Sequence, residues 1–159
     1  MRFKLKHFLF NAFRELFLYH HSSLEFRAKL FAAVIAADLE ADECEYALVK
    51  EAGMKIYDDG DRADALVLTT REYVEKVIEN NGLDIDMLVE DIIKSLRAKP
   101  RFADKIDIEQ LRPLLECRHD PDIRIYQTRI LELFSRLKKE YGTEAASEEG
   151  KRSTENRTP

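Results

Sequence analysis

Acidic side chains at two junctions of the chain are the groups best suited to chemistry. Carboxylates crowd residues 38–45, and a second acidic run spans residues 119–122. Hard divalent cations such as Ca²⁺ or Mg²⁺ prefer oxygen ligands, and about two helical turns would hold the first cluster together. The spacing predicts a divalent-cation site with the candidate ligands Asp38, Glu40, Asp42, Glu45, Asp120 and Asp122.

The same acids have a second interpretation as helix caps. Asp and Glu at a helix N-terminus stabilise it by about 0.3–1 kcal/mol each through the helix dipole. An EF-hand is excluded, because a loop starting at Asp38 has Glu43 where glycine is needed and Val49 where the bidentate glutamate belongs. Capping and cation binding both stay open.

An enzymatic interpretation rests on the dipeptide His119-Asp120, a pair that also occurs in metal-dependent phosphohydrolases. His20 and His21 are further candidate ligands for such a metal cluster. The chain has no glycine-rich phosphate loop and no Ser or Cys in the context of an activated nucleophile. No catalytic constellation is recognised, and a non-enzymatic protein is favoured.

Residues 1–21 predict an amphipathic helix. The helix has a face of phenylalanines and also carries a few cationic residues. This pattern fits three uses of the helix: packing on the core, contact with anionic lipid headgroups, or insertion into a partner's groove. Too few cations are present for a typical polybasic membrane anchor. The candidate anchors for a protein partner are Phe3, Phe10, Phe13 and Phe17, and a peripheral contact at the inner face of the membrane is the alternative.

The composition predicts a single all-helical domain. Gly and Pro number only 5 and 4 in 159 residues, and 45% of the residues are hydrophobic. A net charge of −5 argues against a nucleic-acid partner. Cys44 and Cys117 are too few and too isolated for a disulfide framework, so a reducing, cytoplasmic compartment is the simplest interpretation. No segment is apolar enough over about 18 residues to span a bilayer.

Hydrophobic periodicity and capping signals predict about seven helices. Thr69 and Glu72 have the spacing of a capping box, and Pro121 is placed to open the last long helix. After Tyr141 almost no large apolar residue remains, so apolar burial cannot offset the conformational entropy that the segment would lose on ordering. The predicted divisions are an N-terminal helix over 1–21, a helical domain over 22–141 and a disordered tail over 142–159.

An internal echo links the two junctions. The spacing of Asp38 and Glu40 is repeated by Asp120 and Asp122, and Glu45 corresponds to Gln127. Together with the alanine-rich run Phe31-Ala32-Ala33-Val34-Ile35-Ala36-Ala37-Asp38, this pattern resembles the TerB-like (tellurite-resistance B) superfamily over residues 24–141.

The TerB-like resemblance implies a small helical bundle of two pseudo-repeated helix pairs. Each pair opens with an Asp-Gly step and carries a later Glu at a proposed divalent-metal site, which would make Asp38, Glu45 and Asp120 ligands. Leu39 and Pro121 stand where the family has glycine, and Gln127 is a neutral amide in place of the second Glu. The resemblance also implies a stress-response association. The function expected is a helical interaction module with an unidentified protein partner and an undetermined oligomeric state.

Overall fold

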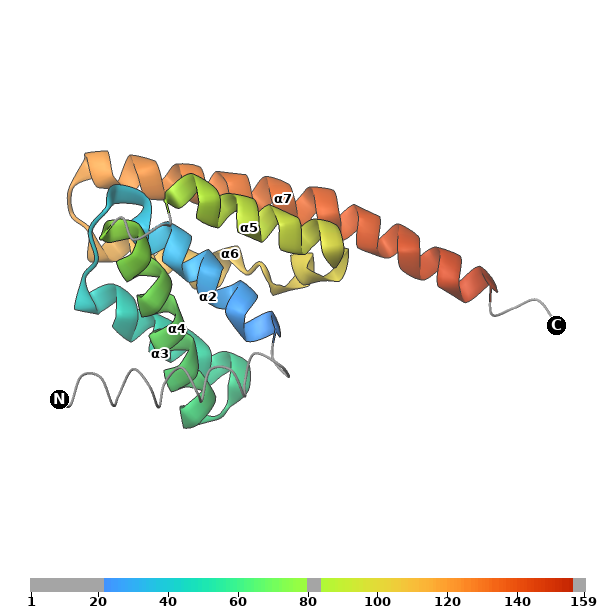
Figure 1. The fold of residues 1–159 in the computed structure, drawn as a ribbon, viewed down its shortest axis with the longest axis horizontal. Coiled ribbons are helices and arrows are strands. Elements are labelled where there is room, and N and C mark those ends of the chain that lie inside the picture. Colours follow the sequence, from blue (N-terminus) through green and yellow to red (C-terminus); the bar gives the residue numbers. More distant parts are fainter. Residues whose placement is uncertain (1–21, 80–83, 156–159) are drawn as a thin grey trace.

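Helices form all the regular structure in residues 22–79 and 84–155, the part that the computed structural model describes (Figure 1). The elements are α2 (Ser22–Ile35), η1 (Ala36–Asp38), α3 (Glu43–Tyr57), α4 (Gly60–Ile78), α5 (Ile85–Ala98), η2 (Pro100–Lys105), α6 (Ile108–Leu111), η3 (Arg112–Cys117) and α7 (Pro121–Glu155). Those marked η are short 3₁₀ helices. The all-helical bundle predicted from the sequence is confirmed. The predicted first helix, over residues 1–21, lies outside the described residues.

Helix α2 is the centre of the core. Every residue from Leu30 to Ala36 is buried, so this stretch has no face left for water. A helix that is apolar all round must be surrounded, and α4, α5, α7 and η2 all pack against α2. The alanines 32, 33 and 36 are fully buried, which lets the neighbouring backbones approach closely. This helix carries its C-terminal end into the first acidic junction.

Helices α3 and α4 form an antiparallel pair that depends on a glycine. A Cβ placed on Gly53 would lie 2.9 Å from the Cα of Ala63, too close for any side chain. The prediction of a helix start at Thr69 is wrong. Helix α4 begins nine positions earlier, capped by Asp59, whose carboxylate accepts a hydrogen bond from the backbone N–H of Asp61. Thr69 is buried in mid-helix, where its hydroxyl donates to the carbonyl of Ala65.

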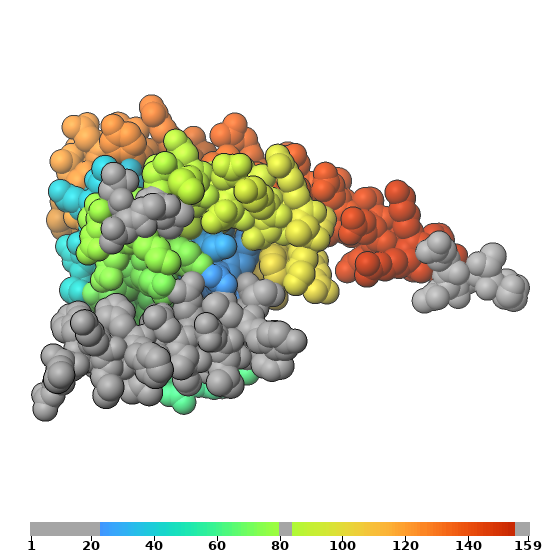
Figure 2. Space-filling model, in the orientation of Figure 1, coloured from blue at the N-terminus to red at the C-terminus, as the bar shows by residue number. Residues whose placement is uncertain are grey.

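Helix α7 is the longest element, and only its first part belongs to the bundle. Gln127, Leu131, Phe134, Leu137 and Tyr141 are buried at helical spacing, and this stretch packs against η1, η2 and α2. Beyond Tyr141 the helix projects past the ends of α5 and η2 (Figures 1 and 2). The predicted disordered tail is therefore corrected for residues 142–155, which continue the helix.

Leu39 ends η1 in a left-handed conformation, with φ 61° and ψ 22°. Its side chain is 59% exposed, so no burial offsets the strain of a Cβ in this region. This is the position where the resemblance implies glycine. The left-handed residue reverses the chain direction between α2 and α3, and so sets the path of the acidic segment that follows.

Candidate functional site

The first acidic junction is organised by the capping box that starts α3. Asp42 is the N-cap, and its Oδ1 accepts a hydrogen bond from the backbone N–H of Cys44 at 2.9 Å. The backbone N–H of Asp42 donates in return to Oε1 of Glu45 at 3.1 Å. This reciprocal arrangement satisfies helix-end donors. It also turns the Glu45 carboxylate inward, where its side chain is 0% exposed.

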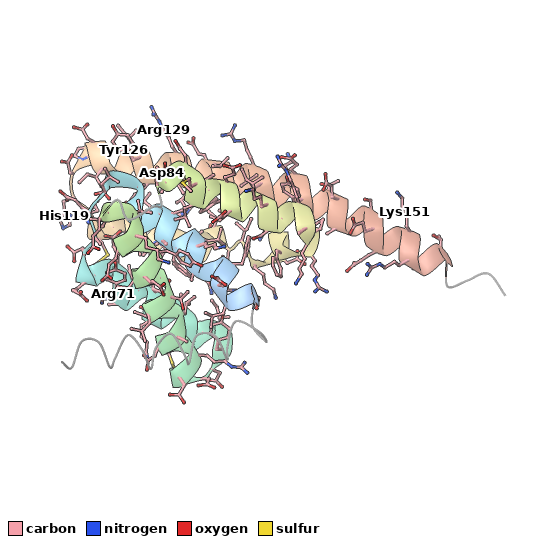
Figure 3. The ribbon with its side chains drawn as sticks, viewed as in Figure 1. Arg71, Asp84, His119, Tyr126, Arg129 and Lys151 are labelled. Carbon is pink, nitrogen blue, oxygen red and sulfur yellow. A yellow bond between two sulfur atoms is a disulfide. The ribbon has the colours of Figure 1, made fainter. Side chains whose placement is uncertain are left out.

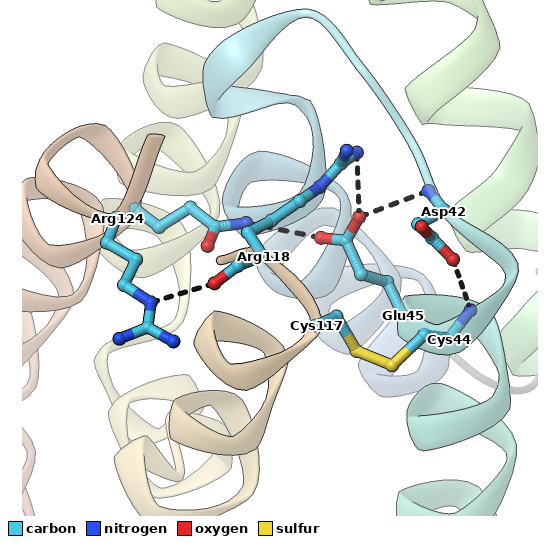
Figure 4. The surroundings of a disulfide bond; sticks show 7 residues. Asp42, Cys44, Glu45, Cys117, Arg118 and Arg124 are labelled. Atoms are coloured by element: carbon cyan, nitrogen blue, oxygen red, sulfur yellow. Dashed lines mark hydrogen bonds and ion pairs between the residues drawn. A yellow bond between two sulfur atoms is a disulfide. The ribbon is translucent and has the colours of Figure 1, made fainter. Parts of the chain in front are cut away.

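A buried arginine from the second junction faces these carboxylates (Figure 4). Arg118 follows η3, and its side chain is only 13% exposed. Its Nη2 lies 3.2 Å from Oε1 of Glu45, and its Nη1 lies 3.4 Å from Oε2 of Glu40. Its Nε lies 3.9 Å from Oδ2 of Asp38, a carboxylate that is itself 4% exposed. We call Asp38, Glu40, Glu45 and Arg118 the arginine cluster.

Gln127 joins the cluster to two further helices. This glutamine is fully buried on α7, and its Nε2 donates to the backbone carbonyl of Val34 and to Oε2 of Glu45, each at 3.2 Å. The amide therefore links α2, α3 and α7 at one point. Glu45 and Gln127 are the two positions that the internal echo equates, and the fold brings them into direct contact.

Arg118 has one positive charge for three carboxylates, and the electrostatics of the cluster reflect this imbalance. Burial raises the pKa of Glu45 to about 7, although the Arg118 guanidinium opposes that shift. Burial likewise raises the pKa of Asp38, against the same opposing charge. Both oxygens of Asp38 and Oε1 of Gln127 are buried without a hydrogen-bond partner. A cluster of this kind costs desolvation energy and needs the surrounding fold to hold it.

A disulfide bridges the two junctions directly beside the cluster. Cys44 and Cys117 are bonded, with their Cα atoms 5.8 Å apart and 73 positions between them in the sequence. The prediction that the two cysteines are isolated is thereby corrected, whereas the compartment stays a prediction. Periodicity could not place the two junctions next to each other, because their contact is made only when η3 packs on α3.

The six candidate metal ligands divide into two groups. Asp38, Glu40 and Glu45 converge on Arg118. Asp42, Asp120 and Asp122 lie at helix starts. Asp42 and Asp120 are caps, the latter accepting a hydrogen bond from the backbone N–H of Asp122 at 2.9 Å, and Asp122 is exposed in the first turn of α7. Within residues 22–79 and 84–155, no group of three or more His, Cys, Asp or Glu side chains is arranged to hold a metal ion.

The arginine cluster does not fit a divalent cation as it stands, because the Arg118 guanidinium already supplies the positive charge among its carboxylates. Cation binding in solution stays a prediction. His119 and Asp120, the pair behind the phosphohydrolase interpretation, lie exposed before the first turn of α7 (Figure 3 labels His119). The other candidates for that metal, His20 and His21, fall outside the described residues, as do Phe3, Phe10, Phe13 and Phe17.

The sequence prediction missed Arg118 and the cysteine pair. One weak signal was available. The residue after Cys44 is the acidic Glu45, and the residue after Cys117 is the basic Arg118. The 73 positions between the two cysteines hide this complementarity from any local pattern. Gln127 was identified only as a departure from a metal-binding pattern, although its buried amide is a central hydrogen-bond donor.

A second feature lies on the outer side of α7, one turn after its start. Ile125 and Tyr126 are 49% and 54% exposed. Arg129 follows at helical spacing and is also exposed, and Tyr126 and Arg129 point away from the bundle (Figure 3). We call Ile125, Tyr126 and Arg129 the outer face of α7. Tyr and Arg are the side chains most enriched at energetically important positions of protein interfaces.

Comparison with known proteins finds no match among protein-family models, curated proteins or solved structures. Membrane crossing also finds no support, since none of the described helices combines the length and apolar character that spanning a bilayer requires. Any statement of function therefore rests on the geometry of the arginine cluster and of the outer face of α7.

Proposed function

We propose that the chain is a non-enzymatic helical interaction module that binds a protein partner through the outer face of α7. The observation that carries the proposal is the pair Ile125 and Tyr126, two large side chains about half exposed at adjacent positions of an ordered helix. Exposed apolar groups bordered by charge favour protein contacts. Asp122 and Arg129 supply that border one turn to either side.

The arginine cluster supports this proposal by fixing the start of α7. Gln127 lies on the turn that carries Ile125 and Tyr126, and its amide is hydrogen-bonded to α2 and α3. Arg124 adds a second tether, since its Nε donates to the backbone carbonyl of Arg118 at 2.8 Å. A face held in this way loses little conformational entropy when a partner binds, which favours affinity.

Affinity capture from cells tests the proposal. The intact protein and the double variant Ile125→Ala/Tyr126→Ala are compared, with Leu68→Ala, a 45% exposed apolar position on α4, as the matched control. We expect one partner to be retained by the intact protein and by Leu68→Ala, and lost with the double variant. Identical captured proteins for all three would contradict the assignment of the surface.

The TerB-like assignment is part of the same proposal. It draws support from the contact between Glu45 and Gln127, the positions equated by the internal echo. The stress-response association depends on that assignment alone. The alternative of a peripheral membrane adaptor depends on residues 1–21, and co-sedimentation with anionic vesicles that falls when salt is raised would support it.

Calorimetric titration with CaCl₂ and MgCl₂ at low salt tests the cation separately. A divalent cation must compete with Arg118 for Asp38 and Glu45, so affinity for the intact protein should be weak. Binding that both Asp38→Ala and Asp120→Ala reduce would support a metal-tuned module. An absence of heat with either salt would leave the interaction module without its metal component.

A further inference from the structure

The Cys44–Cys117 disulfide has a position that a purely stabilising bridge does not require. Each cysteine directly precedes a member of the most buried ion pair of the arginine cluster, Glu45 and Arg118. The covalent bond therefore fixes the two backbones from which these side chains extend (Figure 4). Any change at the sulfurs is transmitted to the ion pair through a single peptide unit on each side.

The bridge is also accessible. Cys44 is exposed in the first turn of α3, and Cys117 is half-buried at the end of η3. Exposed disulfides exchange with thiols more readily than those enclosed in a core, because the attacking thiolate must reach a sulfur in line. The chain thus has a reducible disulfide at its surface, next to the arginine cluster.

We propose that Cys44–Cys117 is a thiol–disulfide exchange site for a dithiol reductant, and that its reduction releases Arg118 from the buried carboxylates. The dithiol's thiolate attacks Sγ of Cys44, the more exposed of the two residues, and Cys117 leaves as a thiolate. The second thiol of the reductant then resolves the mixed disulfide and frees Cys44. Two electrons pass to the protein, the reductant becomes a disulfide, and its two thiol protons end on Cys44 and Cys117.

The release follows from the contacts that hold Arg118. Its Nε and Nη2 meet Asp38 and Glu45 as ion pairs, at 3.9 and 3.2 Å. Glu40, the remaining partner, is a 68% exposed side chain. Burial of these charges costs desolvation energy, which the closed disulfide helps to offset by holding the two backbones together. Once the bridge is open, the segment 117–120 can turn Arg118 outward while Gln127 keeps α7 docked on α2 and α3.

The proposal goes beyond the interaction module, and hydrogen exchange tests it without knowledge of a partner. The native protein is compared before and after treatment with dithiothreitol, with free thiols counted by mass after alkylation. We expect complete reduction under native conditions, and an acceleration of amide exchange in residues 112–120 that exceeds the acceleration in α4 and α5 at least tenfold. The ¹⁵Nε–H signal of Arg118, assigned with Arg118→Lys, should broaden or vanish on reduction.

The double variant Cys44→Ser/Cys117→Ser is the matched control, and it should show the fast exchange with or without dithiothreitol. Resistance of the bond until the whole chain unfolds would overturn the proposal, because the bridge would then be only structural. Reduction that leaves residues 112–120 and the Arg118 signal unchanged would overturn it as well. If the variant fails to fold, the reduced native protein still decides between these outcomes.

Discussion

The two halves of α7 are helical for different reasons. From Pro121 to Tyr141 the helix buries a side chain at every turn after the first, including the fully buried Gln127 and Phe134. From residue 143 to 154 almost every side chain is exposed, and Gly142 and Gly150 lower the intrinsic helix propensity. The first half is stabilised by tertiary contacts. The second is a continuation that adds one hydrogen bond per residue to a helix already nucleated.

The two ends of α7 differ most in the number of contacts that they make with other elements. At the junction a disulfide, a capping box, three ion pairs and a buried amide act on residues from four elements. The part of α7 after Tyr141 lines a shallow hollow with residues 98–101, and its other contacts in the described residues are local, such as that from the hydroxyl of Thr143 to the carbonyl of Lys139. Substitutions at the two ends should therefore differ greatly in cost.

Removal of the disulfide should have the largest effect. Cys44→Ser/Cys117→Ser releases a loop of 73 positions, and the entropy of closing such a loop corresponds to about 4 kcal/mol of unfolding free energy. Urea denaturation of the variant checks this value. Reduced native protein should show a similar loss, and a loss below about 1 kcal/mol in both would mean that the junction is held mainly by its non-covalent contacts.

Loss of Arg118 should have the next largest effect. Arg118→Met removes the cation and leaves Glu45 and Asp38 buried without it, a change that costs about 3 kcal/mol when the carboxylates are ionised. The loss should be smaller at pH 5, where Glu45 is protonated. Denaturant midpoints at pH 5 and pH 8 measure both values. Arg136→Met, an exposed α7 position, is the control and should change little.

Glu45→Gln should change the pH dependence of stability. The folded-state pKa of Glu45 is raised from 4.5 to about 7, so the unfolded chain loses this proton first. The contribution of Glu45 to the free energy of unfolding therefore falls as pH rises from 4.5 to 7, and is constant above pH 7. The variant should remove that fall, so its stability relative to the native protein should improve with pH.

Glu43→Gln is the matched control for this titration. Its hydrogen bond with Arg71 lowers the pKa of Glu43, so its contribution is present above 4.5 and is lost as pH falls. As pH rises, Glu43→Gln should lose stability relative to the native protein below pH 4.5, whereas Glu45→Gln should gain stability between pH 4.5 and 7, so the comparison runs from about pH 3 to 7. Thermal unfolding over this range measures both, and deviations of the same sign would contradict the assigned shifts.

Truncation of the projecting helix should have the smallest effect on stability. Deletion of residues 143–159 removes no buried side chain from the described part, so the unfolding free energy should change by less than about 0.5 kcal/mol. Circular dichroism should nevertheless record the loss of the helix over residues 143–155. A large destabilisation would mean that the two halves of α7 depend on each other after all.

The sequence predicted those features that arise from local chemistry. The start of α7 at Pro121 and helix capping by Asp42 and Asp120 were predicted from short patterns, whereas the capping box predicted at Thr69 was wrong. Gly53 shows the limit of such patterns. In sequence it weakens a helix, whereas in the fold it permits the close crossing of α3 over Ala63.

The candidate site could not be predicted in the same way, because its members come from distant segments. Arg118 pairs with Glu45 across 73 positions, and the cysteine that precedes each of them is a weak signal for the contact. The acidic spacing alone suggested a cation, and the fold supplies a guanidinium there. Local patterns identify caps well, but they do not identify the charge that a distant segment brings to them.

The backbone conformation of Leu39 implies that substitution at this position can raise the stability of the protein. An exposed leucine with φ 61° holds strain that glycine or asparagine would relieve. A library randomised at this codon and screened for survival of heating should therefore enrich glycine and asparagine over the native leucine. Enrichment of leucine instead would indicate that cells retain this side chain for a contact outside the folded chain itself.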